Sequence, residues 1–479
     1  MKRTAVINVV GLTQSLMGPH TPNIRAYAER HAVRAIRPAF PAVTCTAQSN
    51  YLTGAAPSQH GIVGNGWYDR EFAEHRFWKQ PDHIVRQPKI WEALRQQDPS
   101  FTCAKLFWWY NMYAAVDYAI TPRPMYPADG KKVFDIYTQP MGLRETIKQD
   151  LGEFPFPSFW GPMAGIPSSE WIAQSAEWIE AQHAPTLSLI YLPHLDYNLQ
   201  RLGPNDPAMS GDLQAIDAVV GRLIDGFEKR GVQVVLLSEY GITEVNHPVH
   251  LNRIFRKQGW ITIKDELGLE QIDCGASQAF AIADHQVAHI YINDPAIKDQ
   301  VKQTLAAAEG VEQVLDKAEK QACGIDHERA GDLIAVADKD SWFTYYYWED
   351  DAVAPDFARC VDIHRKVGYD PVELFFDPAL RCPKLRIAKN LLKKKLGMRT
   401  LMNVIPLDAS LVKGSHGRIS EDKNEWPVFI GPGGDAEGGA GAGPVAQQRP
   451  RCARTARGLS STEVYGELVR CVAGAPRNC

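Results

Sequence analysis

Four short, almost continuous apolar runs recur along the chain and constrain its fold more than any other feature. They occupy residues 4–12, 102–107, 187–192 and 232–238. Stretches with apolar positions at helical spacing, such as residues 212–229, lie between them. Continuous apolar runs are typical of strands covered on both faces, and parallel strands need helical crossovers. The sequence therefore predicts an α/β fold with a doubly wound, mostly parallel sheet flanked by helices.

The pattern changes after residue 255 and resumes after residue 340. Residues 256–340 contain short strands and a helix, which predicts an inserted α+β cap subdomain. Residues 1–255 and 341–432 are predicted to form the main catalytic domain together. Residues 433–479 are rich in Gly, Ala and Arg, a composition that does not build a core. We expect a flexible tail there, in which residues 461–472 are compatible with one terminal helix.

Composition narrows the classes of partner. The 479 residues carry a formal net charge of −4, which argues against a nucleic-acid polymer as ligand. No run reaches about 18 apolar residues, so no membrane span is expected. The nine cysteines show no CxxC spacing, which favours reduced thiols and predicts a cytoplasmic location. The lysine run 393–395 is interpreted first as solvated surface, with membrane or acidic-partner contact as the less favoured alternative.

One stretch suggests chemistry on its own. Residues 40–54 read Phe-Pro-Ala-Val-Thr-Cys-Thr-Ala-Gln-Ser-Asn-Tyr-Leu-Thr-Gly, a loop that leads into a helix with Thr44 at the junction. Backbone N–H groups and the helix dipole favour an anion at such a junction. Thr44 is therefore a candidate nucleophile that attacks phosphorus. The alternative is that Thr44 only caps the helix.

This stretch resembles the nucleophile segment of the type I phosphodiesterase/nucleotide pyrophosphatase family, within the alkaline phosphatase superfamily. The family pattern begins F-P-[TA]-x-T and ends T-G, with Thr44 at the nucleophile position. Further similar segments follow the family's order, namely Thr-Pro-Asn at 21–23, Pro-Ser-Gln-His-Gly-Ile-Val-Gly-Asn at 57–65, Gly-Ser-His-Gly at 414–417 and Pro-Val-Phe-Ile-Gly-Pro at 427–432. The resemblance covers about residues 4–432. It implies an alkaline phosphatase-like fold and a phosphothreonine intermediate.

The resemblance also implies two divalent metal ions. In the family, one ion is held by an Asp, a His four residues later and a late His. The other is held by an Asp that ends the first strand, the Thr and an Asp-His pair. The matching positions here are Asp196, Gln200 and His416 for the first ion, and Val10, Thr44, Glu239 and Tyr240 for the second. Zinc is the expected ion, with manganese or magnesium as alternatives, and one or two ions remain open.

Two explanations compete for the substituted positions. The chain is either a divergent enzyme with fewer or replacement ligands, or a protein that has lost catalysis and only binds. The first is favoured because residues 362–371 are dense in polar groups. His364 is a candidate replacement ligand, Asp362 a further metal-site residue or its orienting partner, and Arg365 a substrate-binding cation. A structural Asp-His pair is the alternative.

Asn65 and Gln48 are further candidates for binding a phosphate oxygen. His194 would face the same way as Asp196 if that segment is extended. His285 and His289 are predicted not to form a joint site, since their segment reads as strand.

Together these features predict a metal-dependent phosphoric ester hydrolase that acts on a small-molecule phosphodiester or pyrophosphate. The alternatives are a phosphonate or phosphomonoester hydrolase, a phosphotransferase, and a non-catalytic binder of phosphate ligands.

Overall fold

A nine-stranded sheet organises the molecule. The computed structural model describes residues 1–129, 131–432 and 458–474. The sheet has the order β21-β2-β20-β9-β1-β8-β5-β6-β7. Its strands are β1 (Thr4–Val9), β2 (Ala32–Arg37), β5 (Cys103–Leu106), β6 (Tyr118–Pro122), β7 (Ile136–Gln139), β8 (Leu187–Leu192), β9 (Gln233–Leu237), β20 (Val428–Gly431) and β21 (Leu459–Ser460). The central pairs β9–β1, β1–β8, β8–β5 and β5–β6 are parallel, while β20 and β7 run antiparallel to their neighbours.

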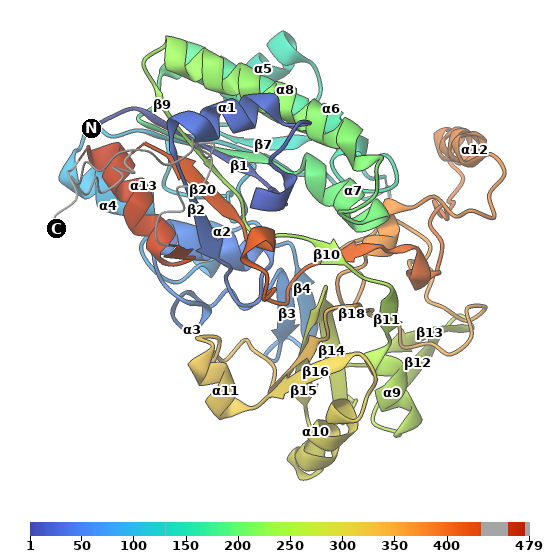
Figure 1. Ribbon diagram of the computed structural model, residues 1–479. Coiled ribbons are helices and arrows are strands. Elements are labelled where there is room, and N and C mark those ends of the chain that lie inside the picture. The colour runs from blue at the N-terminus through green and yellow to red at the C-terminus, as the bar shows by residue number, and fades with distance from the viewer. Residues whose placement is uncertain (130, 433–457, 475–479) are drawn as a thin grey trace.

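Helices cover both faces of this sheet, as the sequence predicted. Figure 1 shows one layer on one face, formed by α1 (Pro22–Arg30), α5 (Leu143–Leu151), α6 (Ile166–His183) and α8 (Met209–Lys229). The other face carries α2 (Thr44–Thr53), α4 (Ile90–Gln97) and α13 (Glu463–Ala473). The main hydrophobic core lies between the sheet and these layers. Further helices outside these two layers are α3 (Pro57–His60), α7 (His194–Leu202) and α12 (Pro383–Lys395).

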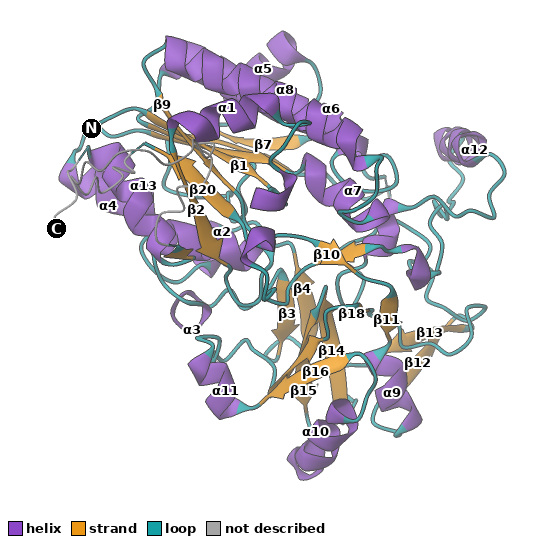
Figure 2. Ribbon diagram, in the orientation of Figure 1, coloured by secondary structure: helices purple, strands orange, loops and turns teal. Residues whose placement is uncertain are grey.

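A second, smaller sheet lies at one end of the first (Figure 2). It is antiparallel and has the order β14-β15-β17-β16, with β14 (Ala279–Asp284), β15 (Val287–Ile292), β16 (Val311–Leu315) and β17 (Leu333–Ala337). Around it lie α9 (Leu251–Lys257), α10 (Lys298–Ala306) and α11 (Lys317–Ala322). The remaining ladders are β3 (Gly66–Asp69) with β4 (Glu74–Phe77), β10 (Thr243–Glu244) with β19 (Gly414–Ser415), β11 (His247–Val249) with β18 (Ser341–Phe343), and β12 (Ile263–Glu266) with β13 (Leu269–Ile272). The small sheet lies within the predicted insertion, residues 256–340.

The end of the chain differs from the predicted flexible tail. Strand β21 pairs with β2, and helix α13 packs against α2 and α4. Leu459, Val464 and Leu468 are buried in the main core. The helix itself agrees with the expected terminal helix at 461–472, and its apolar positions recur at helical spacing. Residues 433–457 and 475–479 of the predicted tail lie outside the described residues. Among the helices that the structure describes, none combines the length and apolarity needed to cross a bilayer.

The buried His289 on β15 predicts loss of stability in acid. Its Nδ1 accepts a hydrogen bond from the Gly331 N–H (3.1 Å), and its Nε2 donates to the Val63 carbonyl (2.9 Å). Burial lowers the pKa of His289 to about 4, so between pH 6.5 and 4 the unfolded chain binds more protons. Stability from this residue is complete above pH 6.5, and about 3 kcal/mol is lost as the pH falls to 4. Urea unfolding at pH 7 and pH 4.5 should show a smaller difference for His289→Gln than for wild type. An equal difference would contradict the assignment.

Candidate active site

Thr44 is the first residue of α2 and is only 3% exposed. The start of this helix is fixed by Asn65, whose Oδ1 accepts the Cys45 N–H (3.0 Å). The backbone N–H and the side-chain amide of Asn65 in turn donate to Asp284, at 2.8 and 3.0 Å. Both ends of the Asn65 amide are therefore engaged within the protein. Asn65 thus orients the helix that carries Thr44, and its predicted contact with substrate stays a prediction.

A phenol links Thr44 to a carboxylate. Thr44 Oγ1 lies 3.0 Å from Tyr240 Oη, which donates to Asp196 Oδ1 at 3.1 Å. Because the Tyr240 proton is given to Asp196, the Thr44 hydroxyl is the donor to Tyr240. Tyr240 follows β9, Asp196 follows β8, and Thr44 follows β2. Asp196 and Tyr240 therefore lie at the carboxyl ends of the parallel strands β8, β1 and β9. Open α/β sheets bind their ligands at this end of the strands.

Asp196 is held by a second set of hydrogen bonds within α7. Gln200, one turn later on the same face, donates to Asp196 Oδ2 at 2.7 Å. Tyr369 Oη donates to Gln200 Oε1 at 3.0 Å. Burial raises the pKa of Asp196 to about 7, and the hydrogen bonds from Tyr240 and Gln200 partly oppose this rise. Because α7 begins at His194, the extended arrangement proposed for His194 and Asp196 is wrong, and His194 Nε2 lies 3.1 Å from Asp212.

His416 lies beside this chain of hydrogen bonds. Its Nδ1 donates to the Ala42 carbonyl (2.7 Å), and its Nε2 is 3.9 Å from Asp196 Oδ1. The imidazole stacks on the Tyr240 ring, with centroids 3.7 Å apart, and burial lowers its pKa to about 3. Gly414, two residues earlier, lets β19 lie close against α7, because a Cβ at this position would lie 2.0 Å from the Leu199 carbonyl oxygen. His416 is therefore neutral and fixes the plane of Tyr240.

Glu239 lies near Thr44 but is bound by amides. Its Oε1 accepts from Gln48 Nε2 (2.6 Å) and from the Asn8 side chain. Its Oε2 has no hydrogen-bond partner among the described residues. Burial raises the pKa of Glu239 to about 8, and the hydrogen bonds from Gln48 and Asn8 partly oppose this rise.

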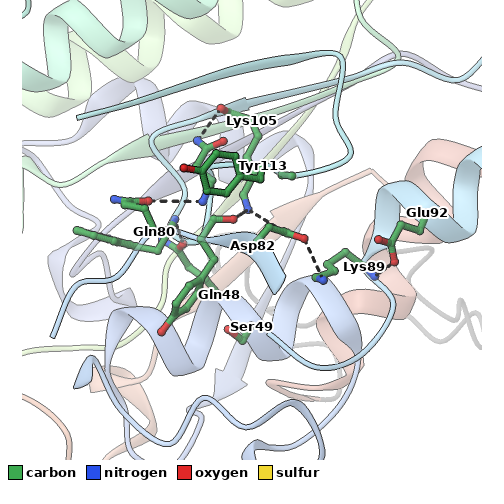
Figure 3. A network of polar contacts seen from close by, with 12 residues as sticks. Gln48, Ser49, Gln80, Asp82, Lys89, Glu92, Lys105 and Tyr113 are labelled. Atoms are coloured by element: carbon green, nitrogen blue, oxygen red, sulfur yellow. Dashed lines mark hydrogen bonds and ion pairs between the residues drawn. The ribbon is translucent and has the colours of Figure 1, made fainter. Parts of the chain in front are cut away.

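Gln48 also belongs to a second polar network, which includes Asp82, Lys89 and Lys105 (Figure 3). Gln48 Oε1 accepts the Trp109 N–H (2.7 Å), so neither end of its side chain faces a ligand. The loop beyond Trp109 is held by the buried Lys105, which donates to the Tyr110 carbonyl at 2.6 Å. Asp82 lies 3.9 Å from Lys105 and 3.0 Å from Lys89. Gln48 thus links Glu239 to this loop, and its predicted contact with phosphate stays a prediction.

The polar run at 362–371 does not reach Thr44. His364 Nδ1 lies 3.3 Å from the Phe77 carbonyl, and the Asp362 N–H donates to Glu373 (2.8 Å). Arg365 is half exposed and pairs with Asp356 at 3.0 Å. No hydrogen bond or ion pair among the described residues joins these three side chains to Asp196 or His416. The polar groups of His364, Asp362 and Arg365 therefore pair locally, whereas Tyr369 of the same run bonds to Gln200 beside Asp196.

The family profile described as type I phosphodiesterase / nucleotide pyrophosphatase matches residues 4–370. The chain belongs to this family.

The chain is also similar to a curated relative and to solved structures, and it spans less than half the length of that relative. An uncharacterized pyrophosphatase/phosphodiesterase of Schizosaccharomyces pombe is 27% identical over 249 residues, which cover 49% of this chain and 44% of that relative. Murine ectonucleotide pyrophosphatase/phosphodiesterase 5, an inactive variant with AMP, covers the whole chain (97% of its own) at 15% identity and a TM-score of 0.58. Phosphonoacetate hydrolase of Sinorhizobium meliloti, with phosphonoformate, covers 98% (96% of its own) at 13% identity and a TM-score of 0.59. These likenesses confirm the predicted alkaline phosphatase-like fold.

The residues at the family's metal-ligand positions do not fit the two-ion set. Among the described residues, no three His, Cys, Asp or Glu side chains are grouped so that they could hold one ion. Val10 is a buried hydrocarbon, and Tyr240 donates to Asp196 rather than offering a lone pair. Gln200 also turns its N–H toward Asp196. Hydrogen-bond donors thus meet both oxygens of Asp196 and Oε1 of Glu239, whereas Glu239 Oε2 lacks a partner among the described residues. The predicted ligands Glu239, Asp196, His416, His364 and Asp362 are not assembled as one set among those residues.

Sequence reasoning missed the aromatic groups of the site. His285 lies in the turn between β14 and β15, at φ 60°, and stacks on both His416 (3.6 Å) and Tyr369 (3.8 Å). The small sheet therefore contributes to the site. His289 faces Val63 instead, in accord with the prediction that the two histidines form no joint site. A two-residue gap between apolar runs signals the turn, but nothing in the sequence places that turn beside His416.

Proposed function

We propose that this chain hydrolyses a phosphodiester or pyrophosphate bond of a small molecule, with Thr44 as the nucleophile. Membership of the type I phosphodiesterase family supports a hydrolase that acts on phosphoric esters. One observation carries the assignment of Thr44. Its hydroxyl opens α2 and is hydrogen-bonded through Tyr240 to Asp196. A nucleophile needs such a path for its proton, and an anionic substrate is favoured at a helix start.

The chain's own residues carry the proton of the nucleophile, and solvent exchanges the other protons. As Thr44 Oγ1 bonds to phosphorus, its proton passes to Tyr240 Oη, and the Tyr240 proton passes to Asp196. The bond from phosphorus to the leaving oxygen breaks, and that oxygen keeps the electron pair and takes a proton from solvent. Water then attacks the phosphothreonine and gives up a proton to solvent. The bond from phosphorus to Thr44 Oγ1 breaks, and Thr44 recovers its proton from Asp196 through Tyr240.

A non-catalytic binder of phosphate ligands is the second candidate. The specific observation in its favour is that Val10, Gln200 and Tyr240 replace family metal ligands. The same helix start would favour a phosphate without reaction. Turnover separates the two candidates.

The direct test is turnover by the full chain of bis-p-nitrophenyl phosphate, p-nitrophenyl phosphate, a dinucleotide polyphosphate and phosphonoacetate. The proposal expects the diester or the polyphosphate to be the best substrate. Acid quenching is expected to trap one phosphoryl group, still carrying the substituent that was not displaced, on the peptide that contains Thr44. A preference for the monoester or the phosphonate would change the substrate class. Inertness toward all four, with phosphate still bound, would leave the binder.

Removal of divalent metal gives a second expected result. Because hydrogen bonds meet the site's carboxylates, chelation with EDTA followed by gel filtration is expected to change turnover by less than about twofold. Elemental analysis of the same sample should find less than one ion per chain. A loss of turnover that zinc, manganese or magnesium restores would show that a metal is required and would contradict this prediction.

Tyr240→Phe tests the proton path. The variant keeps the ring that stacks on His416 and removes only the hydroxyl between Thr44 and Asp196. We expect kcat to fall by about 100-fold, the usual effect of losing a proton-transfer group. Tyr369→Phe is the matched control, because its hydroxyl reaches only Gln200, and its loss is expected to stay below about tenfold. Equal losses in the two variants would indicate a general packing effect.

A further inference from the structure

Helix α12 presents an apolar stripe to solvent. Leu385, Leu392 and Leu396 are 69%, 58% and 67% exposed, and the exposed Ala388 lies between them in the sequence. Spacings of three and four residues place these side chains on one face of the helix. The opposite face is tethered by the buried Asn390, which donates to the Leu401 carbonyl at 3.1 Å. The apolar face of α12 therefore points away from the protein, the reverse of the usual arrangement.

Cations border this stripe on both sides. Residues 381–399 contain eight Lys and Arg and no Asp or Glu, although the whole chain has a net charge of −4. At about 100° per residue, Lys384 and Lys395 lie along one side of the stripe, and Lys389 and Lys393 along the other. The ion pairs found among the described residues include none of these eight cations. Their charge is thus available to an external anion.

The position of α12 leaves the stripe accessible. Figure 1 shows α12 at the edge of the molecule, apart from both sheets and from the start of α2. The helix contributes no side chain to the network of Thr44, Tyr240 and Asp196. A role for α12 is therefore separate from the proposed catalysis.

We propose that α12 docks the protein onto an anionic lipid surface. The helix would lie in the plane of the membrane, with its leucines in the boundary between headgroups and acyl chains. The lysine stems would extend along this boundary and place their ammonium groups on lipid phosphates. An acidic polypeptide would use the cations but needs no aligned leucine stripe, and an apolar protein groove would use the leucines but not the flanking cations. The combination favours lipid.

Vesicle sedimentation with the purified full chain tests this surface. Binding to phosphatidylglycerol/phosphatidylcholine vesicles is expected to be at least about tenfold tighter than to phosphatidylcholine alone, and to weaken with added salt. Leu392→Ser/Leu396→Ser and Lys389→Gln/Lys393→Gln should each weaken binding by at least about tenfold, because each removes one of the two contributions.

Matched controls lie elsewhere on the surface. Leu267→Ser removes a fully exposed leucine from the turn between β12 and β13. Lys298→Gln/Lys317→Gln removes two exposed lysines from the starts of α10 and α11. Both should bind vesicles like wild type, and all variants should keep the wild-type unfolding midpoint.

Absence of vesicle binding, or equal binding by the α12 variants, would overturn the proposal. Retention on immobilised polyglutamate without vesicle binding would also overturn it and assign α12 to an acidic protein partner. The vesicle assay does not depend on turnover, so its outcome is independent of the proposed hydrolase function.

Discussion

Thr44→Ala is expected to reduce turnover of bis-p-nitrophenyl phosphate by at least about 1000-fold, because the variant has no oxygen to form the phosphothreonine. The small cavity left by the hydroxyl and methyl groups should leave folding intact. Tyr240 and Asp196 would keep their mutual hydrogen bond of 3.1 Å. Steady-state kinetics and mass spectrometry of the acid-quenched enzyme measure the two expected losses, of rate and of the trapped phosphoryl group.

Two variants make this result specific. Thr44→Ser restores an oxygen at the same position and should retain activity well above the alanine variant. Thr53→Ala removes a threonine from the other end of α2, where its hydroxyl bonds only to the helix backbone around Ser49 and Ala55. That variant should remain within about tenfold of wild type. If Thr44→Ala keeps more than a tenth of wild-type turnover, Thr44 is not the nucleophile.

Lys366→Met is expected to destabilise the protein by about 3–5 kcal/mol, the usual cost of leaving buried charge without its partner. Lys366 is completely buried and lies 2.7 Å from both Asp370 and Glu373. Methionine fills much of the same volume but would leave two buried carboxylates facing each other. Urea unfolding, followed by tryptophan fluorescence, gives the change in the free energy of unfolding.

The adjacent residue provides the control. Arg365 is half exposed, and its ion pair with Asp356 is screened by solvent. Arg365→Met should change the free energy of unfolding by less than about 1 kcal/mol. If Lys366→Met loses as little stability as Arg365→Met, this segment tolerates charge removal and Lys366 is not its structural centre.

Much of the fold was predictable because its signals are local. The apolar runs at 4–12, 187–192 and 232–238 became β1, β8 and β9, since a run buried on both faces has no polar alternation to confuse it. Thr44 was placed at a helix start by the residues around it, and the structure agrees. Elements whose position depends only on their own sequence were found.

The site was predictable only in part, because its contacts join distant segments. Tyr240 and Gln200 were interpreted as lost ligands from their type alone, whereas the structure shows that their polar hydrogens face Asp196. His364 was favoured from its neighbours in the sequence, but it contacts the Phe77 carbonyl instead. His285 reaches the site from another sheet. Spacing along the chain carries no information about such encounters.

The order of strands in the large sheet also determines when it can be completed during synthesis. Strand β2 contacts β9 only through β20, which lies between them and ends at Gly431. At usual rates of translation, a ribosome needs about 20 to 80 seconds to make the residues between β2 and β20. Strand β2 stays unpaired throughout that interval, and the edge of β9 is open from the synthesis of β9 until β20 is made. We expect the incomplete sheet to depend on chaperones during synthesis, because its open edge can pair with other chains. A chain truncated before β20 should therefore aggregate rather than form a smaller functional protein.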